Sequence, residues 1–120
     1  PKGSCLGMLE EVQWLLFDHF SLPKDRITFV KGWFENTVPA KANEIEKLAL
    51  LRLDGDWYES TRICLVNLYD KVSLDGFVII DDYDSCAGSK RAVDEFLLEN
   101  AIRVELKSDG RGGRWFRKPA

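Results

Sequence analysis

The chain has 120 residues, of which 45% are hydrophobic and 31% charged, and we expect one domain over residues 1–120. This composition excludes a disordered chain, which combines low hydrophobicity with high net charge. The formal net charge is −3 and no apolar run reaches the roughly 20 residues of a transmembrane helix. We therefore expect no nucleic acid as a partner, because a protein that binds it needs clustered positive charge. We also expect no membrane as a partner.

The first part of the chain predicts one helix and one strand. Apolar residues recur at helical spacing over residues 6–20, which predicts an amphipathic helix. The β-branched and aromatic run at 27–30 predicts a strand. We expect residues 32–37 to form a loop or a single helical turn, and the polar residues 40–46 to be solvated.

The rest of the chain alternates apolar runs of strand length with helical patterns. We expect strands at 48–53, 77–80, 102–106 and 114–117, and helices at 58–70 and 88–99. The near-continuous apolar run at 48–53 suits a strand covered on both faces. The order therefore predicts an α/β fold whose sheet is mostly parallel, with helices on both faces and a C-terminal antiparallel hairpin.

Acidic residues follow two of these strands at the point where each strand ends. Asp54 comes directly after the first, and Asp81 and Asp82 follow the second. Because ligands of open α/β sheets bind beyond the carboxyl ends of the strands, we expect these three carboxylates to lie close together. Clustered carboxylates repel one another, and a hard divalent cation such as Mg²⁺ relieves the repulsion.

Structural explanations compete with this site. Asp56 has Glu59 three residues later, the pattern of a capping box at the start of a helix, and we favour capping for Asp56. For Asp81 and Asp82 the alternative is a solvated turn, and here the pairing with Asp54 favours the site.

Several segments resemble the macrocin O-methyltransferase family, from about residue 6 to the end of the chain. They are GWF at 32–34, LLRLDGDWYEST at 50–61, NLY at 67–69, GFVIIDDY at 76–83 and AVDEF at 92–96. Members are class I enzymes that depend on S-adenosylmethionine and magnesium and methylate sugar hydroxyls in antibiotic biosynthesis. The resemblance implies a Rossmann-like sheet, these two cofactors and a small-molecule glycoside, such as a macrolide, as substrate.

The resemblance also implies roles for particular residues. Asp54, Asp81 and Asp82 match the metal-binding acids of the family, and we take Asp54 as the general base. The cation would hold vicinal sugar hydroxyls and lower the pKa of the one that is methylated.

The remaining candidate residues flank the proposed site. Gly32 and Trp33 follow the strand that flanks the adenine in this fold, so they are candidates for the cofactor pocket; for Trp33 plain packing is equally open. Tyr83, next to the acids, is a candidate substrate contact, and core packing is equally open for it.

The sequence departs from the family at its beginning. Class I methyltransferases place a glycine-rich turn after the first strand and an acid after the second, and this sequence contains neither. The resemblance therefore covers the C-terminal part of the domain, and we expect a piece of an enzyme, a naturally partial protein, or a homodimer whose copies complete the sheet.

Three functions remain open on this sequence. The first is a sugar O-methyltransferase, or its catalytic C-terminal part. The second is a truncated, non-catalytic methyltransferase-like module. A receiver domain, which also gathers acids around magnesium, ranks last because Lys107 is the only lysine near the required place. Three cysteines without metal-type spacing argue against a disulfide framework and favour a cytoplasmic location.

Overall fold

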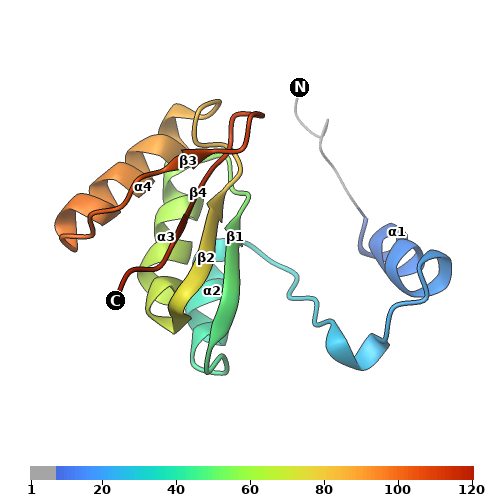
Figure 1. Ribbon diagram of the computed structural model, residues 1–120. Helices are drawn as coiled ribbons and strands as arrows, with labels where there is room; N and C mark the ends of the chain where they lie inside the picture. Colours follow the sequence, from blue (N-terminus) through green and yellow to red (C-terminus); the bar gives the residue numbers. More distant parts are fainter. Residues whose placement is uncertain (1–7) are drawn as a thin grey trace. The chain divides into compact units, whose positions relative to one another are not determined.

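The computed structural model describes residues 8–120, which belong to two compact units, residues 1–31 and 32–120. In the first unit, helix α1 (Leu9–Gln13) continues into the π-helix η1 (Trp14–His19), and a short 3-10 helix η2 (Lys24–Arg26) follows (Figure 1). The predicted helix over residues 6–20 is confirmed where the structure describes it, and its first two residues lie outside the described part. The expected single domain over 1–120 stays a prediction.

The predicted strand at 27–30 is wrong. Ile27 has the extended backbone of a strand, with φ −127° and ψ 125°, but residues 27–30 pair with no segment among the described residues. A β-strand exists only through hydrogen bonds to a neighbouring strand, and local sequence preference supplies no neighbour.

The second unit contains a four-stranded sheet with three main helices (Figure 1). Its elements are α2 (Phe34–Ala42), β1 (Leu48–Leu53), α3 (Tyr58–Leu68), η3 (Tyr69–Lys71), β2 (Val72–Ile80), α4 (Ala87–Glu99), β3 (Lys107–Ser108) and β4 (Arg114–Arg117). The strand order is β1-β2-β4-β3, with β1 and β2 parallel and the other two pairings antiparallel. The predicted α/β class with a C-terminal antiparallel hairpin is confirmed.

Alternate residues of the strands form the core under α3 and α4. Leu53, Val78, Ile80 and Phe116 are buried there together with side chains of both helices. The opposite face carries the exposed Leu50 and other apolar residues. Figure 1 shows both helices on the same side of the sheet, so helices cover one face within residues 32–120, not the two expected.

The sheet is also less parallel than expected, because one of its three pairings is parallel. The segment 102–106 forms no strand. Backbone pairing in this region is limited to the two residues of β3 that follow it. Instead, Ile102, Val104 and Leu106 pack their side chains against the core. Their alternating apolar pattern therefore reflects burial of side chains and not backbone pairing.

Residues 34–42 form a helix, longer than the loop or single helical turn expected at 32–37, and it extends into the stretch 40–46 that was expected to be solvated. The Trp33 carbonyl accepts hydrogen bonds from the Asn36 and Thr37 N–H groups and from the Thr37 hydroxyl, and these bonds start the helix. Pro39 lies inside α2 although it donates no hydrogen bond there, and Ala42 at its end is buried. Packing of α2 against α3 supplies stabilisation that local propensity did not predict.

Candidate functional site

The acidic residues that follow β1 and β2 leave the sheet at the same edge. Leu53 pairs with Ile80 in the parallel register, and the Asp81 N–H donates to the Leu53 carbonyl at 2.9 Å. The residues after both strands therefore start side by side. Among the described residues, the acidic ligand atoms that lie within 4.8 Å of one another include Asp82 but neither Asp54 nor Asp81, and the expected convergence of the three carboxylates stays a prediction. Their functional roles stay predictions.

Asp82 is the acid with the most constrained environment. Its Oδ2 atom is buried and has no hydrogen-bond partner among the described residues. Burial raises the pKa of Asp82 to about 6, with further contributions from hydrogen bonding and charge repulsion by Asp56 and Asp54. An orphaned carboxylate oxygen beside two other acids fits a divalent cation, which would satisfy that oxygen and relieve the repulsion.

This environment makes the stability of the cation-free protein depend on pH. The pKa of Asp82 is raised from 3.8 in the unfolded chain to about 6, so between these values the native state binds more protons. The stabilisation that Asp82 adds to the free energy of unfolding is therefore fully present below pH 3.8. It falls as the pH rises and is lost above a pH of about 6. We expect thermal unfolding in chelator to show this decline in the wild type but not in Asp82→Asn; parallel curves would contradict it.

Asp81 and Asp54 share an arginine that the sequence analysis did not identify. Arg52 forms an ion pair with Asp81, in which its Nε donates to Oδ1 at 3.3 Å, and its guanidinium lies 3.8 Å from Asp54 Oδ2. The hydrogen bond with Asp81 is the main reason that the pKa of Arg52 is raised. The sequence does contain a signal for this contact: Arg52 is a positively charged residue two positions before Asp54, and residues two apart lie on the same face of a strand.

Asp56 does not cap α3, so the predicted capping box is wrong. The residue at the N-cap is Trp57, and it makes no side-chain capping bond. The Asp56 carboxylate instead joins a cluster with Asp82 and Cys86, in which one ligand atom from each lies within 4.8 Å of the others. The carboxylates of Asp56 and Asp82 follow different strands, so they repel each other only in the folded chain. A cation bound between them would attract both.

Two close packing contacts place this cluster. Thr61, buried in α3, donates from Oγ1 to the Gly55 carbonyl at 2.8 Å and so holds the loop after β1. A Cβ on Gly88 would lie 2.8 Å from the Tyr58 nitrogen, so only glycine lets the first turn of α4 approach the start of α3. These contacts bring Asp56, at the start of one helix, to Cys86, at the start of the other.

Thr61→Val is expected to lower the unfolding free energy by about 1–3 kcal/mol, because the Gly55 carbonyl loses its buried donor while the volume is nearly kept. Thermal unfolding monitored by circular dichroism should show a lower Tm, by about 4–8 °C for each kcal/mol. The control is Ser60→Ala, which removes an exposed hydrogen bond to the Trp57 carbonyl in the same turn and should change stability by less than about 0.5 kcal/mol. Equal effects of the two variants would contradict the assignment.

The structure describes the surroundings of Tyr83, Gly32 and Trp33, the remaining candidate residues. Tyr83 is 8% exposed and its hydroxyl donates to Asp94 Oδ1 at 2.6 Å, so most of its side chain packs in the core. A contact of Tyr83 with substrate stays a prediction. Trp33 is 73% exposed, which excludes core packing within residues 32–120. Gly32 has φ +141°, a conformation that favours glycine. A cofactor role for these two residues stays a prediction.

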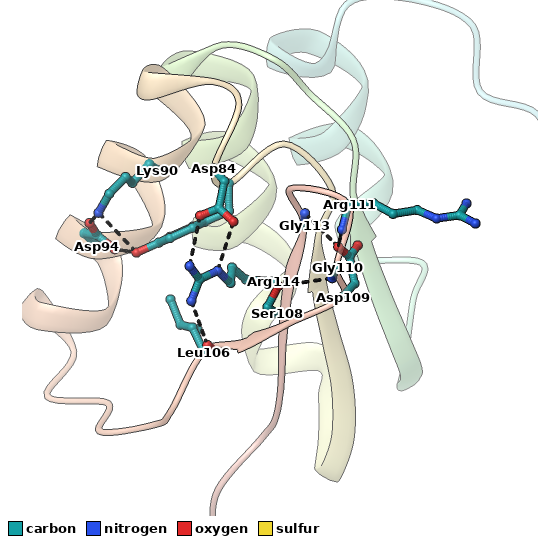
Figure 2. A network of polar contacts seen from close by, with 11 residues as sticks. Asp84, Lys90, Asp94, Leu106, Ser108, Asp109, Gly110, Arg111, Gly113 and Arg114 are labelled. Atoms are coloured by element: carbon teal, nitrogen blue, oxygen red, sulfur yellow. Dashed lines mark hydrogen bonds and ion pairs between the residues drawn. The ribbon is translucent and has the colours of Figure 1, made fainter.

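The C-terminal hairpin is tied to the loop that carries the acids (Figure 2). Arg114 donates from Nε to Asp84 Oδ2 at 3.2 Å and from Nη1 to the Leu106 carbonyl at 3.2 Å. Asp109 closes the hairpin turn by accepting the Gly113 N–H at 3.0 Å. The arginine thus ties the loop after β2 to the C-terminal hairpin.

No helix within residues 8–120 is long and apolar enough to cross a membrane.

Comparisons with known proteins converge on one family. The profile described as "Macrocin-O-methyltransferase (TylF)" matches residues 6–118. The chain is 41% identical over 117 residues to the demethyldecarbamoylnovobiocin O-methyltransferase of Streptomyces niveus, covering 98% of this chain and 44% of the relative. It is 40% identical over 117 residues to the 8-demethyl-8-(2,3-dimethoxy-alpha-L-rhamnosyl)-tetracenomycin-C 4'-O-methyltransferase of Streptomyces olivaceus, covering 95% of this chain and 42% of the relative.

A solved structure gives the same result at the level of the fold. The O-methyltransferase NovP superposes with a TM-score of 0.87 at 42% sequence identity, over 93% of this chain and 45% of NovP. The chain thus spans less than half the length of the relatives that it matches.

Proposed function

Because the chain belongs to the TylF macrocin-O-methyltransferase family, we propose that it carries the metal-binding part of an S-adenosylmethionine- and magnesium-dependent enzyme that methylates a sugar hydroxyl of a natural-product glycoside. The observation that carries this proposal is the buried Oδ2 of Asp82, which has no hydrogen-bond partner in the described part of the chain and lies near Asp54 and Asp56 at the carboxyl ends of two parallel strands. The names of the relatives, which are natural-product O-methyltransferases, support the reaction class.

In this proposal Asp54, Asp81 and Asp82 hold Mg²⁺, with Asp56 beside them. When bound, the cation lowers the pKa of a coordinated hydroxyl. Asp54, whose side chain is exposed, accepts the sugar hydroxyl proton at a carboxylate oxygen; such a base contributes about 100- to 10,000-fold to a rate. Arg52 orients Asp81 through its ion pair and stabilises the Asp54 carboxylate from 3.8 Å.

The cofactor side of the site is proposed from the family resemblance. Trp33 presents an exposed indole, which can stack on the adenine ring of S-adenosylmethionine. The backbone at Gly32, with its positive φ, turns the chain just before that indole. The face of the sheet that no helix of residues 32–120 covers carries the exposed apolar side chains of Leu50 and Phe77. Exposed apolar surface favours association, here with a second copy of the chain. We also propose a cytoplasmic location.

The test is calorimetric titration of S-adenosylmethionine into the 120-residue chain, with and without Mg²⁺, followed by methyl transfer from labelled cofactor to a deoxysugar glycoside. The enzyme is supported by magnesium-dependent cofactor binding and by methyl transfer that Asp54→Ala abolishes. Binding of Mg²⁺ without cofactor binding would instead favour the second candidate, a non-catalytic module with an intact metal side. Sedimentation velocity at high concentration tests the dimer, and a monomer throughout would contradict it.

A further inference from the structure

Arg52 binds Asp81 through both of its carboxylate oxygens. The Arg52 Nε donates to Asp81 Oδ1 at 3.3 Å, and its Nη2 donates to Oδ2 of the same carboxylate. A guanidinium that reaches both oxygens of a carboxylate forms one of the stronger kinds of ion pair between side chains. The side chain of Asp81 is 26% exposed, so water screens the pair only in part. Asp81 is therefore already neutralised by a cation of the chain itself.

This ion pair lies on the face of the sheet opposite to α3 and α4. Leu51 and Leu53, the neighbours of Arg52 in β1, are buried in the core under these helices. Side chains alternate between the two faces of a strand, so Arg52 projects from the other face, as the exposed Leu50 does. Figure 1 shows that face without a helix from residues 32–120. Asp81, which follows β2, meets Arg52 on this side.

The other acids at the strand ends gather around Asp82. Ligand atoms of Asp56 and Asp82 lie within 4.8 Å of each other, and Asp56 and Asp54 both raise the pKa of Asp82. Within residues 8–120, the group of ligand atoms with this spacing does not include Asp81. A cation that binds both Asp82 and Asp81 therefore has to compete with Arg52 for the negative charge of Asp81.

We propose that Arg52 is a positioning residue that competes with Mg²⁺ for Asp81, so that binding of the cation opens the Arg52–Asp81 ion pair and turns Asp81 toward Asp82. This inference rests on the proposed cation site and adds to it the residue that limits its affinity. Mg²⁺ has to break the ion pair, and it is repelled by the guanidinium charge. After the ion pair opens, Arg52 still has an acid beside it, because Asp54 Oδ2 lies 3.8 Å from Nη2.

Arg52→Gln tests the proposal by calorimetric titration of Mg²⁺ into the 120-residue chain. Glutamine keeps a polar side chain that can donate to Asp81, but it carries no charge. We expect the Mg²⁺ Kd to fall by about 2- to 5-fold, the factor that a partly exposed ion pair contributes. In Arg52→Lys, which keeps the charge and loses the two-pronged contact, the Kd should fall less. A Kd that does not fall in Arg52→Gln, or that falls further in Arg52→Lys, would overturn the proposal.

The matched control is Arg117→Gln. Arg117, in β4, is another exposed arginine that pairs with an aspartate, because its Nη2 lies 2.9 Å from Asp75 Oδ2. Asp75 belongs to the first half of β2, away from the strand end that Asp81 follows. The control changes the net charge as Arg52→Gln does, and its Mg²⁺ Kd should stay within the error of the measurement. An equal fall of the Kd in both variants would reveal an effect of net charge and would overturn the role of Arg52.

The wild-type chain offers a second readout, in the side-chain proton–nitrogen correlation spectrum of its arginines. The Nε–H resonance of Arg52 is assigned by its absence from Arg52→Lys. Mg²⁺ should move it toward the position of a solvated arginine, in proportion to the occupancy of the site. A resonance that stays in place while Mg²⁺ binds would overturn the proposal and leave the proposed function standing, since that function needs only the binding. A wild-type chain that binds no Mg²⁺ would overturn both.

Discussion

Asp82→Asn is expected to raise the Kd for Mg²⁺ and Mn²⁺ by at least about 100-fold, since loss of an outer-shell partner alone costs about 10- to 100-fold. Asp82 supplies a buried oxygen that has no hydrogen-bond partner among residues 8–120, and the carboxylates of Asp56 and Asp54 act on it. An amide removes the charge that attracts the cation but can donate hydrogen bonds to the neighbouring carboxylates. The variant should therefore fold and should lose binding in calorimetry with Mg²⁺ and in Mn²⁺ electron paramagnetic resonance.

The matched control for this variant is Asp84→Asn. Asp84 lies in the same loop after β2, but its carboxylate pairs with Arg114 at 3.2 Å and takes no part in the cluster (Figure 2). Its replacement removes one acid of the loop and should leave the cation Kd within the error of the measurement. Wild-type affinity in Asp82→Asn, or an equal loss in the control, would remove the basis of the metal site.

Ile80→Ala is expected to lower the unfolding free energy by about 2–5 kcal/mol, the range for truncating a buried isoleucine. Ile80 is 0% exposed and belongs to the hydrophobic core, at the end of the strand that pairs with both β1 and β4. Domains have free energies of unfolding of about 5–15 kcal/mol, so this single change removes a large part of the total stability. Urea unfolding followed by circular dichroism measures it, with the denaturant slope checked for constancy.

Leu98→Ala is the control for this core truncation. Leu98 lies in α4 but is 83% exposed, so removing the same kind of apolar side chain there should change stability by less than about 0.5 kcal/mol. Similar losses in the two variants would contradict the placement of the core between β2 and the helices. Because Ile80 directly precedes Asp81, its truncation should also weaken cation binding, which the control should not.

The elements of the second unit that follow from burial were predictable from the sequence. The apolar run at 48–53 is β1 and the run at 114–117 is β4, each with the bounds expected from its flanking polar residues. The helices over 58–68 and 87–99 match their periodic apolar faces, because one stripe of each must be removed from water. The strand at 77–80 was placed correctly but begins earlier, at Val72.

The local patterns failed where a hydrogen-bond partner lies far away in the sequence. Residues 27–30 and 102–106 have strand-like composition, yet neither pairs over its length with a neighbour in the described residues. The helix at 34–42 forms against the preference of Pro39 because packing on α3 outweighs propensity. Backbone pairing and helix packing are properties of two segments, and the sequence of one segment does not contain them.

For the candidate site, the sequence by itself determined that Asp54, Asp81 and Asp82 follow two parallel strands, and the alternation of strands and helices requires those strand ends to meet. Only the tertiary structure decided which side chains share the resulting space. It turned Asp56 and Cys86 toward Asp82, and it placed Tyr83 in the core. The physical reason is that side-chain direction depends on the contact between α3 and α4, whose close approach at residue 88 brings together segments about 30 residues apart.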